Sequence, residues 1–338
     1  MLHVVHHVDY MAPPPERGTF KFDKYQLVMR ILRESGYPLA EHAPPPCPRE
    51  WLEAVHDPAY VEQVLTQTVP RERERRIGFP VTAHIAQRVQ HTNGGTWLAA
   101  QLAMEHGYAA NSAGGSHHSL HEGGAGYCVF NDLAVAANRL LAQGDVRRIL
   151  IVDCDVHQGD GTASLMAGRD DVFTLSLHAE KNFPVRKAQS NRDVPLPDGM
   201  GDAAYLEALA RHLPEVMDAF APDLVLYQAG VDPHRDDKLG RLALSDAGLD
   251  ARDRYVVAEA RRRGLPVASA LGGGYGADQH EVAGRHARSM LAMAQENARF
   301  APPIASTVAS SAPAMNDERW RFHAETSGGS AARASRPR

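Results

Sequence analysis

Cysteine is scarce in this chain of 338 residues, and no apolar run is long enough to cross a membrane. The three cysteines, Cys47, Cys128 and Cys154, are far apart and include no C-x-x-C pair. An odd number of widely spaced cysteines cannot form a disulfide framework and favours a reducing compartment. The first residues lack the basic and apolar regions of a secretion signal. We therefore expect a cytoplasmic protein that does not bind a membrane.

An excess of positive charge is also absent. The chain has 36 Lys and Arg residues against 41 Asp and Glu residues, a formal net charge of −5. No general positive field then draws it to nucleic acid or anionic lipid, and we expect no direct nucleic-acid binding. Histidine, by contrast, is common, with 18 residues. We interpret the isolated ones as structural or surface residues: His3, His6, His7, His42, His56 and His323.

Short apolar runs alternate with amphipathic stretches along most of the chain. Runs rich in Val, Ile and Leu predict buried strands over 146–156, 172–177, 223–230 and 266–271. Apolar residues at three- and four-residue spacing predict helices over 24–35, 84–106, 133–143, 202–220, 246–263 and 277–298. This alternation predicts an α/β domain with a parallel sheet and helices on both faces.

The composition changes near residue 300. Proline-rich stretches at 13–15 and 44–48 predict loops within the first part of the chain. From about residue 301 the sequence is rich in Ala, Ser, Pro and Gly and poor in large apolar residues. We expect one catalytic domain over 1–300 and a low-complexity, disordered tail over 301–338.

Acidic residues and a histidine follow the strand predicted over 146–156. Asp153, Asp155 and His157 alternate, so they share one side of the strand and its exit. Two acids and an imidazole there need a compensating cation or hydrogen bonds, and a divalent metal would supply the charge. Asp237, in a later Asp-rich loop, could supply a third ligand. The alternative is that these acids cap helices and bind solvent.

Two glycine-rich loops carry further polar groups. His117 and His118 can serve as general base and acid if acids such as Asp153 and Asp160 hold their tautomers. Tyr275 lies in the run Gly272–Gly276, where its hydroxyl could donate to a carbonyl oxygen that gains charge. A dinucleotide-binding loop is excluded because this run follows the last predicted strand, not the first.

Together these motifs resemble the zinc-dependent histone deacetylase superfamily, which includes acetoin-utilisation proteins and acetylpolyamine amidohydrolases. The segments GGSHHSLHEGGAGYCVFND, IVDCDVHQGDGT, LSLHAEKNFP, QAGVDPHRDD and LGGGYG occur in the family's order, and the bacterial class-IV-like branch is most similar. The resemblance implies a single arginase/deacetylase-like α/β domain with an eight-stranded parallel sheet. It also implies a metal-polarised acyl carbonyl and a metal-activated water.

The resemblance also assigns roles to residues. The metal ligands would be Asp155, His157 and Asp237, and the metal would be Zn²⁺, with Fe²⁺ or Co²⁺ as alternatives. The catalytic residues would be His117, His118, Asp153, Asp160 and Tyr275. The substrate channel would be lined by Tyr127, Phe183, Gly126 and Gly273. A structural K⁺ would bind oxygens of Asp153, Asp155, His157, Ser176 and Leu177.

The function implied is metal-dependent hydrolysis of an N-acyl amide that releases acetate. The substrate would be acetyl-lysine in a protein or a small acetylated amine. The alternatives are a catalytically silent acyl-lysine-binding regulatory protein and an arginase-like ureohydrolase. An oligomer is compatible with the sequence.

Two features near the expected channel rim bear on the substrate. Gly78 stands where eukaryotic histone deacetylases carry a rim-loop aspartate that binds the peptide backbone, so we expect no peptide anchoring by that device. The charged run Arg71–Arg76 precedes it. We interpret this run as a solvated face, and the alternative is that it meets an acidic substrate or partner.

Overall fold

Eight short parallel strands form one sheet at the centre of the described chain. The computed structural model describes residues 1–12 and 22–300. The strands are β1 (Leu2–Val5), β2 (Leu39–His42), β3 (Tyr108–Asn111), β4 (Ile149–Asp153), β5 (Val172–Ala179), β6 (Arg192–Leu196), β7 (Leu224–Gln228) and β8 (Val267–Ala270). Their order across the sheet is β2-β1-β3-β8-β7-β4-β5-β6.

The middle of the sheet is buried on both faces. Every residue of β3, β4, β7 and β8 is buried. β4 lies between β5 and β7, with Asp153 in register with Ser176 on one side and Gln228 on the other. Doubly covered parallel strands are apolar on both faces, which explains the continuous Val, Ile and Leu runs.

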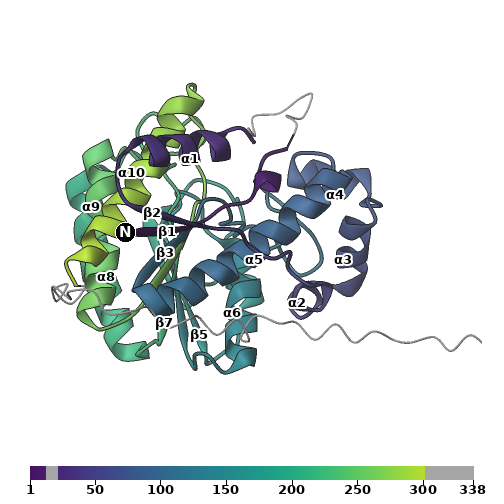
Figure 1. Cartoon of the computed structure of the whole chain (residues 1–338), viewed down its shortest axis with the longest axis horizontal. Coiled ribbons are helices and arrows are strands. Elements are labelled where there is room, and N and C mark those ends of the chain that lie inside the picture. Colours follow the sequence, from purple (N-terminus) through teal and green to yellow (C-terminus); the bar gives the residue numbers. More distant parts are fainter. Residues whose placement is uncertain (13–21, 301–338) are drawn as a thin grey trace, which may run out of the picture. The chain divides into compact units, whose positions relative to one another are not determined.

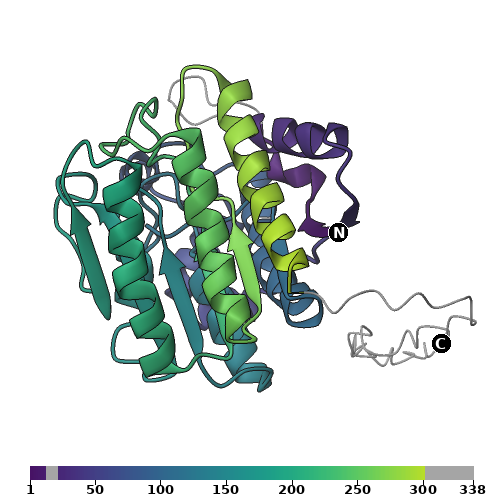
Figure 2. The ribbon, with the colours of Figure 1, turned by 90° about the vertical axis from the view of Figure 1, so that its left-hand side faces the viewer.

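Helices cover both faces of the sheet (Figure 1). The helices are η1 (Val8–Tyr10), α1 (Lys24–Glu34), α2 (Arg49–Glu53), α3 (Pro58–Leu65), α4 (Arg71–Ile77), α5 (Ala83–His106), α6 (Asp132–Gln143), α7 (Asp160–Leu165), α8 (Asp202–Phe220), α9 (Asp246–Arg262) and α10 (Gln279–Ala298). Figure 2 shows α8, α9 and α10 side by side over one face, and α5 packs with α6 on the other. None of the described helices is both long and apolar enough to span a membrane.

The structure confirms the predicted α/β class, the parallel sheet and the helices on both faces. All four predicted strands and all six predicted helices are present, with ends that differ by a few residues. Residues 44–48 form a loop as predicted. The predicted loop over 13–15 and the predicted tail over 301–338 lie outside the described residues, and the domain boundary near 300 stays a prediction.

Candidate active site

Four segments selected from the sequence follow neighbouring strands and meet at one edge of the sheet. Strands β3, β8, β7 and β4 are adjacent and run in the same direction. Because the carboxyl ends of parallel strands lie at the same edge, the residues that follow them converge there. The segments 112–118, 271–276, 229–237 and 154–160 occupy this edge. One site is therefore built from four distant parts of the chain.

His117 and His118 lie side by side, each bonded to its own carboxylate. The Nδ1 atom of His117 lies 2.7 Å from Oδ2 of Asp153, and Nδ1 of His118 lies 2.7 Å from Oδ1 of Asp160. The two ring centroids are 4.1 Å apart, and both rings are buried. Since Nδ1 donates to the carboxylate, the Nε2 atom of each ring is left for the site.

The two imidazoles differ in their affinity for a proton. Burial disfavours a charge on His117, but the carboxylates of Asp153 and Asp155 outweigh it and raise the pKa of His117 to about 9. Burial and the neighbouring His117 lower the pKa of His118 to about 4. His118 is therefore the neutral imidazole of the pair, and its Nε2 atom can accept a proton.

A buried aspartate missed in the sequence analysis holds the loop before these histidines. Asp132, at the start of α6, is fully buried. Its carboxylate accepts the N–H groups of Gly115 at 2.9 Å and Ser116 at 2.6 Å, and the hydroxyl of Thr96. Asp132 thus positions the backbone that leads into His117. Its sequence signal is weak, because an acid in the first turn of a helix is common for reasons of the helix dipole alone.

Asp155, His157 and Asp232 form a buried cluster whose ligand atoms all lie within 4.8 Å of one another. Nδ1 of His157 is 3.0 Å from Oδ1 of Asp155 and 3.3 Å from Oδ2 of Asp232. Oδ1 of Asp232 accepts the N–H of Val156 at 2.8 Å, whereas Oδ2 is buried and completes no hydrogen bond. Such an oxygen costs free energy unless a cation or a proton compensates it.

This set of donors fits a divalent cation. Two carboxylates and a neutral imidazole balance a charge of +2, and Oδ2 of Asp232, which completes no hydrogen bond, lies 3.3 Å from Nδ1 of His157 within the cluster. Carboxylate and imidazole ligands suit Zn²⁺ and also accept Fe²⁺ or Co²⁺. The cluster could therefore hold the metal that the sequence analysis expects.

Asp237, the third ligand expected from the sequence, lies outside this three-residue cluster. Its Oδ1 atom accepts the N–H groups of Leu239 at 2.8 Å and Gly240 at 2.9 Å, and its Oδ2 atom accepts the N–H of Tyr275 at 2.6 Å. Asp237 therefore positions the backbone of Tyr275. The sequence analysis missed Asp232, whose only signal is that it precedes Asp237 in the same loop.

Aromatic side chains line the approach to this cluster. A cavity of about 350 Å³ opens beside Tyr127, Phe183 and Tyr275 and extends to His118 and His157. The ring of Phe183 meets that of His118 edge-on, with centroids 4.7 Å apart, and the rings of Tyr127 and Tyr275 are 5.7 Å apart. Flat walls of this kind accept a narrow aliphatic stem.

Two glycines let the backbone approach these side chains closely. A Cβ atom on Gly126 would lie 2.6 Å from the ring of His118, and one on Gly273 would overlap the carboxylate of Asp232. The neighbouring Tyr127 has a positive φ of 68°. This conformation costs a non-glycine residue on the order of 1–3 kcal/mol, and such strain concentrates at functional sites.

Gly78 lies at the outer end of the same cavity. It ends α4 with a φ of 103°, and a Cβ atom there would lie 2.7 Å from the ring of Tyr127. Any side chain at this position would therefore displace a wall of the channel.

A buried arginine supports the site from behind. Arg252 of α9 is fully buried, and its Nη1 atom donates to the carbonyl oxygens of Cys154 at 3.1 Å and Gly230 at 2.7 Å. Cys154 directly follows β4, and Gly230 comes two residues after the end of β7. Its Nε atom donates to Asp253 at 2.8 Å. The sequence analysis missed this role, because an arginine in an amphipathic helix usually faces solvent.

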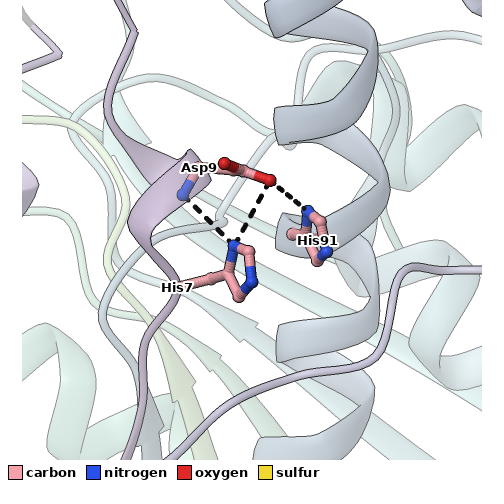
Figure 3. Close-up of side chains that lie close together, drawn as sticks. All are labelled: His7, Asp9 and His91. Carbon is pink, nitrogen blue, oxygen red and sulfur yellow. Dashed lines mark hydrogen bonds and ion pairs between the residues drawn. The ribbon is translucent and has the colours of Figure 1, made fainter.

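A second group of ligand-type side chains joins η1 to α5. Figure 3 shows His7, Asp9 and His91 close together. Oδ2 of Asp9 lies 3.1 Å from His91 Nδ1 and 3.5 Å from His7 Nδ1, and the two rings stack with centroids 3.8 Å apart. The lone pairs of stacked rings run side by side and do not converge on one ion, and Nδ1 of His7 already accepts the N–H of Asp9. This group fits a metal less well than the buried cluster does.

Comparisons with known proteins place these features in context. A family model described as the histone deacetylase domain matches residues 19–291. An uncharacterised protein of Picosynechococcus sp. is 45% identical over 285 residues, which cover 84% of this chain and 95% of that protein. A histone deacetylase-like amidohydrolase of Pseudomonas aeruginosa is 33% identical over 157 residues, 43% of this chain and 41% of that protein.

Solved structures show the same fold. A crystal structure of an acetylpolyamine aminohydrolase from Burkholderia pseudomallei superposes with a TM-score of 0.71 at 22% identity. The match covers 87% of this chain and 98% of the other. At this identity the likeness establishes the architecture.

Proposed function

Because this chain belongs to the histone deacetylase family, we propose that it hydrolyses the acyl amide of an N-acetylated amine, with Zn²⁺ as cofactor, to acetate and a free amine. The substrate is acetyl-lysine in a protein or a small acetylated amine. Fe²⁺ or Co²⁺ would substitute for Zn²⁺ at a site of this ligand type.

One observation carries the proposal. Two imidazoles, each held at Nδ1 by a carboxylate, lie beside a buried Asp–His–Asp cluster at the inner end of an aromatic-walled cavity. The cavity supplies selectivity for a thin acylated stem, and the cluster supplies the charge needed to activate an amide and a water.

The residues around the cluster divide the reaction between them. A divalent cation held by Asp155, His157 and a carboxylate of the 232–237 loop would polarise the acyl carbonyl and acidify a water molecule. Nε2 of His118 accepts a proton from the attacking water and delivers it to the departing amine nitrogen. His117, protonated beside Asp153, stabilises the negative charge that develops on the oxygen atoms attached to the acyl carbon when water attacks it.

Tyr275 faces the same space. Its backbone is held by Asp237, and its ring lies 6.5 Å from that of His157. Burial and the nearby carboxylate of Asp155 raise the pKa of Tyr275 well above its usual range, so its hydroxyl keeps its proton. We assign this hydroxyl as a donor to the carbonyl oxygen as the oxygen gains charge.

Further parts of the proposal concern the surroundings of the site. A structural K⁺ would bind oxygens of Asp153, Asp155, His157, Ser176 and Leu177, and the register that pairs Asp153 with Ser176 supports this. The cysteines Cys47, Cys128 and Cys154 are buried and form no disulfide, which supports a cytoplasmic location.

The test is acetate release by the metal-reconstituted chain from three substrates in parallel: an acetyl-lysine peptide, free acetyl-lysine and an acetylated polyamine. A metal-chelating hydroxamate serves as the control. Turnover that the hydroxamate abolishes would support the deacetylase. A chain that binds one metal ion and acyl-lysine without cleaving any substrate would be the silent binding protein, and urea release from arginine would indicate the ureohydrolase.

A further inference from the structure

Two arginines line the outer part of the substrate cavity. Arg75 and Arg76, in the last turn of α4, border the cavity of about 350 Å³ whose inner end reaches His118 and His157. Both arginines are exposed. No aspartate or glutamate is among the described residues that line this cavity. The entrance is therefore positive, although the whole chain carries a net charge of −5.

Backbone hydrogen bonds hold this turn of α4 at the channel wall. The N–H of Gly126 donates to the carbonyl oxygen of Arg76 at 3.0 Å, and the N–H of Tyr127 donates to that of Ile77 at 2.7 Å. The helix then ends at Gly78, against the ring of Tyr127. Because Tyr127 is itself a channel wall, the arginines keep a defined position beside the path of the substrate.

Neither arginine is neutralised within the described residues. No ion pair joins Arg75 or Arg76 to an acid there, and Glu72, one turn before Arg76, makes none with it. Glu74 accepts the N–H of Val81 at 2.8 Å instead. Arg76 also borders a neighbouring cavity that Glu122 lines, without pairing with it.

Other charges near the entrance do not reverse its sign. Lys238 is exposed and precedes Leu239, which lines the cavity. Two acids precede Lys238 directly, Asp236 and Asp237. The carboxylate of Asp236 lies 3.4 Å from the guanidinium of Arg285. On the other side Lys181 is exposed and precedes Asn182, with Glu180 before it. A ligand that enters this cavity thus meets two unpaired guanidinium groups.

We propose that Arg75 and Arg76 select acylated amines that also carry a carboxylate at the end of the stem remote from the acyl group, where it meets the cavity entrance. This inference rests on the proposed function and names its substrate class. A guanidinium binds a carboxylate through two parallel N–H donors, whereas a polyamine chain would be repelled. The carboxylate can be the α-carboxylate of a free acyl-amino acid or an acidic side chain of a peptide, and the experiment separates these sources.

The experiment compares matched substrates that differ in charge. Nε-acetyl-lysine blocked at its α-amine is assayed with a free α-carboxylate and as its methylamide, alongside acetylspermidine. Acetyl-lysine peptides with aspartate or lysine on both sides form the second arm. An exposed ion pair changes an equilibrium by about 1.4- to 5-fold, so two arginines should favour the anionic member by about tenfold in kcat/KM, mainly through KM.

Charge reversal supplies the variant. In R75E/R76E the preference should invert, with the anionic substrate losing about tenfold or more and acetylspermidine gaining. Arg71→Glu is the control, because it reverses one charge at an exposed position of the same helix without lining the cavity, and it is compared with the single variants R75E and R76E as well as with the double variant. The control should keep the wild-type preference. Raising the salt concentration from about 0.1 M to 1 M shortens the screening length from about 10 Å to 3 Å and should reduce the preference.

The outcomes separate this inference from the proposed function. Binding of the same compounds is measured by calorimetry in parallel. Even if the chain cleaves none of them, their dissociation constants still show whether it prefers the anionic compounds. Cleavage with equal or better use of the methylamide and acetylspermidine would overturn the inference and leave the deacetylase standing. The same holds if R75E/R76E keeps the wild-type preference. A preference confined to the free α-carboxylate identifies a small acyl-amino acid, and one confined to aspartate-flanked peptides identifies an acidic protein segment.

Discussion

At the scale of single residues, Tyr275 depends on a partner that comes from another loop. Its N–H donates to Asp237 at 2.6 Å, and its ring faces those of Tyr127 and His157. We predict that Tyr275→Phe lowers kcat by about 10²–10³-fold, because the donor to the developing oxyanion is lost while the ring stays. Steady-state kinetics test this, with metal content measured on the same sample. A near-wild-type rate in a metallated variant would remove Tyr275 from the mechanism.

The choice between Asp232 and Asp237 as third ligand can also be tested. Asp232→Asn and Asp237→Asn each remove one charge with almost no change of shape. The variant that loses a direct ligand should weaken Zn²⁺ binding more than the other variant, because loss of a carboxylate that only positions its neighbours costs about 10–100-fold or less. Competition with a fluorescent chelator measures both constants. If neither variant weakens binding, a metal held by this loop is excluded.

The sequence motifs located residues that the structure brings together: His117, His118, Asp153, Asp155, His157 and Asp160. Asp153, Asp155, His157 and Asp160 could be placed because they lie at or just after β4, whose apolar run is visible in the sequence, whereas His117 and His118 were located by their glycine-rich motif alone. Asp132, Asp232 and Arg252 were missed. Their importance comes from burial against other segments, and a single sequence does not show which acids and arginines are buried.

At the scale of elements, the buried Arg252 joins α9 to the segments that follow β4 and β7. Arg252 and Asp253 are both 0% exposed, and Arg252 also holds the carbonyls after β4 and β7. We predict that Arg252→Met destabilises the fold by about 3–5 kcal/mol, because it leaves the buried Asp253 carboxylate without its ion-pair partner and with only the hydroxyl of Tyr227 as a side-chain donor among the described residues. Urea unfolding measures the loss. Arg262→Met on the same helix is the control, since Arg262 is exposed and Glu259 keeps its ion pair with Arg263, so the loss should be about 1 kcal/mol or less.

A buried histidine links the turn between α2 and α3 to the start of α6. Nδ1 of His56 donates to the carbonyl oxygen of Leu120 at 2.9 Å, and its Nε2 accepts the N–H of Asn131 at 3.0 Å. The ring is fully buried, and burial lowers its pKa from 6.5 to about 4. The unfolded chain therefore takes up a proton between these values that the folded chain refuses, so stability falls as the pH drops through this window.

The resulting loss should reach roughly 3 kcal/mol between pH 6.5 and 4. We predict that His56→Gln flattens the dependence of unfolding free energy on pH in this window, whatever its effect at pH 7. Denaturant unfolding at half-unit steps of pH measures the slope. The same substitution at exposed His280 shows the effect of losing an imidazole elsewhere. An unchanged slope in His56→Gln would contradict a neutral buried ring.

Elements with strong periodicity were predictable, and short ones were not. The helix over 202–220 matches α8 at both ends, because its apolar residues recur over five turns. Strands β1, β2, β3 and β6 were missed: β1, β2 and β3 have four residues each, and β6 is an edge strand with polar residues and Pro195. Four-residue segments carry too little pattern to separate strand from loop.

At the scale of the whole molecule, the cluster of buried acids at the sheet edge should make folding depend on the metal. Without a cation, the buried carboxylates of Asp155 and Asp232 share one imidazole, that of His157, to offset their charges. A ligand at about a thousand times its Kd stabilises by roughly 4 kcal/mol, so dialysis against a chelator should lower Tm by roughly 5–10 °C. Calorimetry measures this, and Zn²⁺ should restore the original Tm. A chelated protein with unaltered Tm and no bound metal would argue against a cation in the cluster.

The class of the fold was predictable because apolar runs, which form strands, alternate along the chain with amphipathic stretches, which form helices. The order of the strands was not. The spatial order of the strands, β2-β1-β3-β8-β7-β4-β5-β6, depends on which crossover connections pack best. The pairing of β3 with β8, for example, joins segments that are more than 150 residues apart in the chain. The convergence of four loops at one edge follows from that order.

The contact between Gly78 and the ring of Tyr127 has a consequence for how this rim can evolve. A Cβ atom at position 78 collides with the ring, and a φ of 103° disfavours any side chain there. An acidic anchor at this position is therefore not one mutation away: the turn must first be reshaped, or the aromatic wall turned aside, and either intermediate would have an impaired channel. The effect of a substitution at position 78 therefore depends on the residue at position 127, so the two positions are epistatic. The side chains available for substrate recognition at this rim are limited by its present backbone conformation.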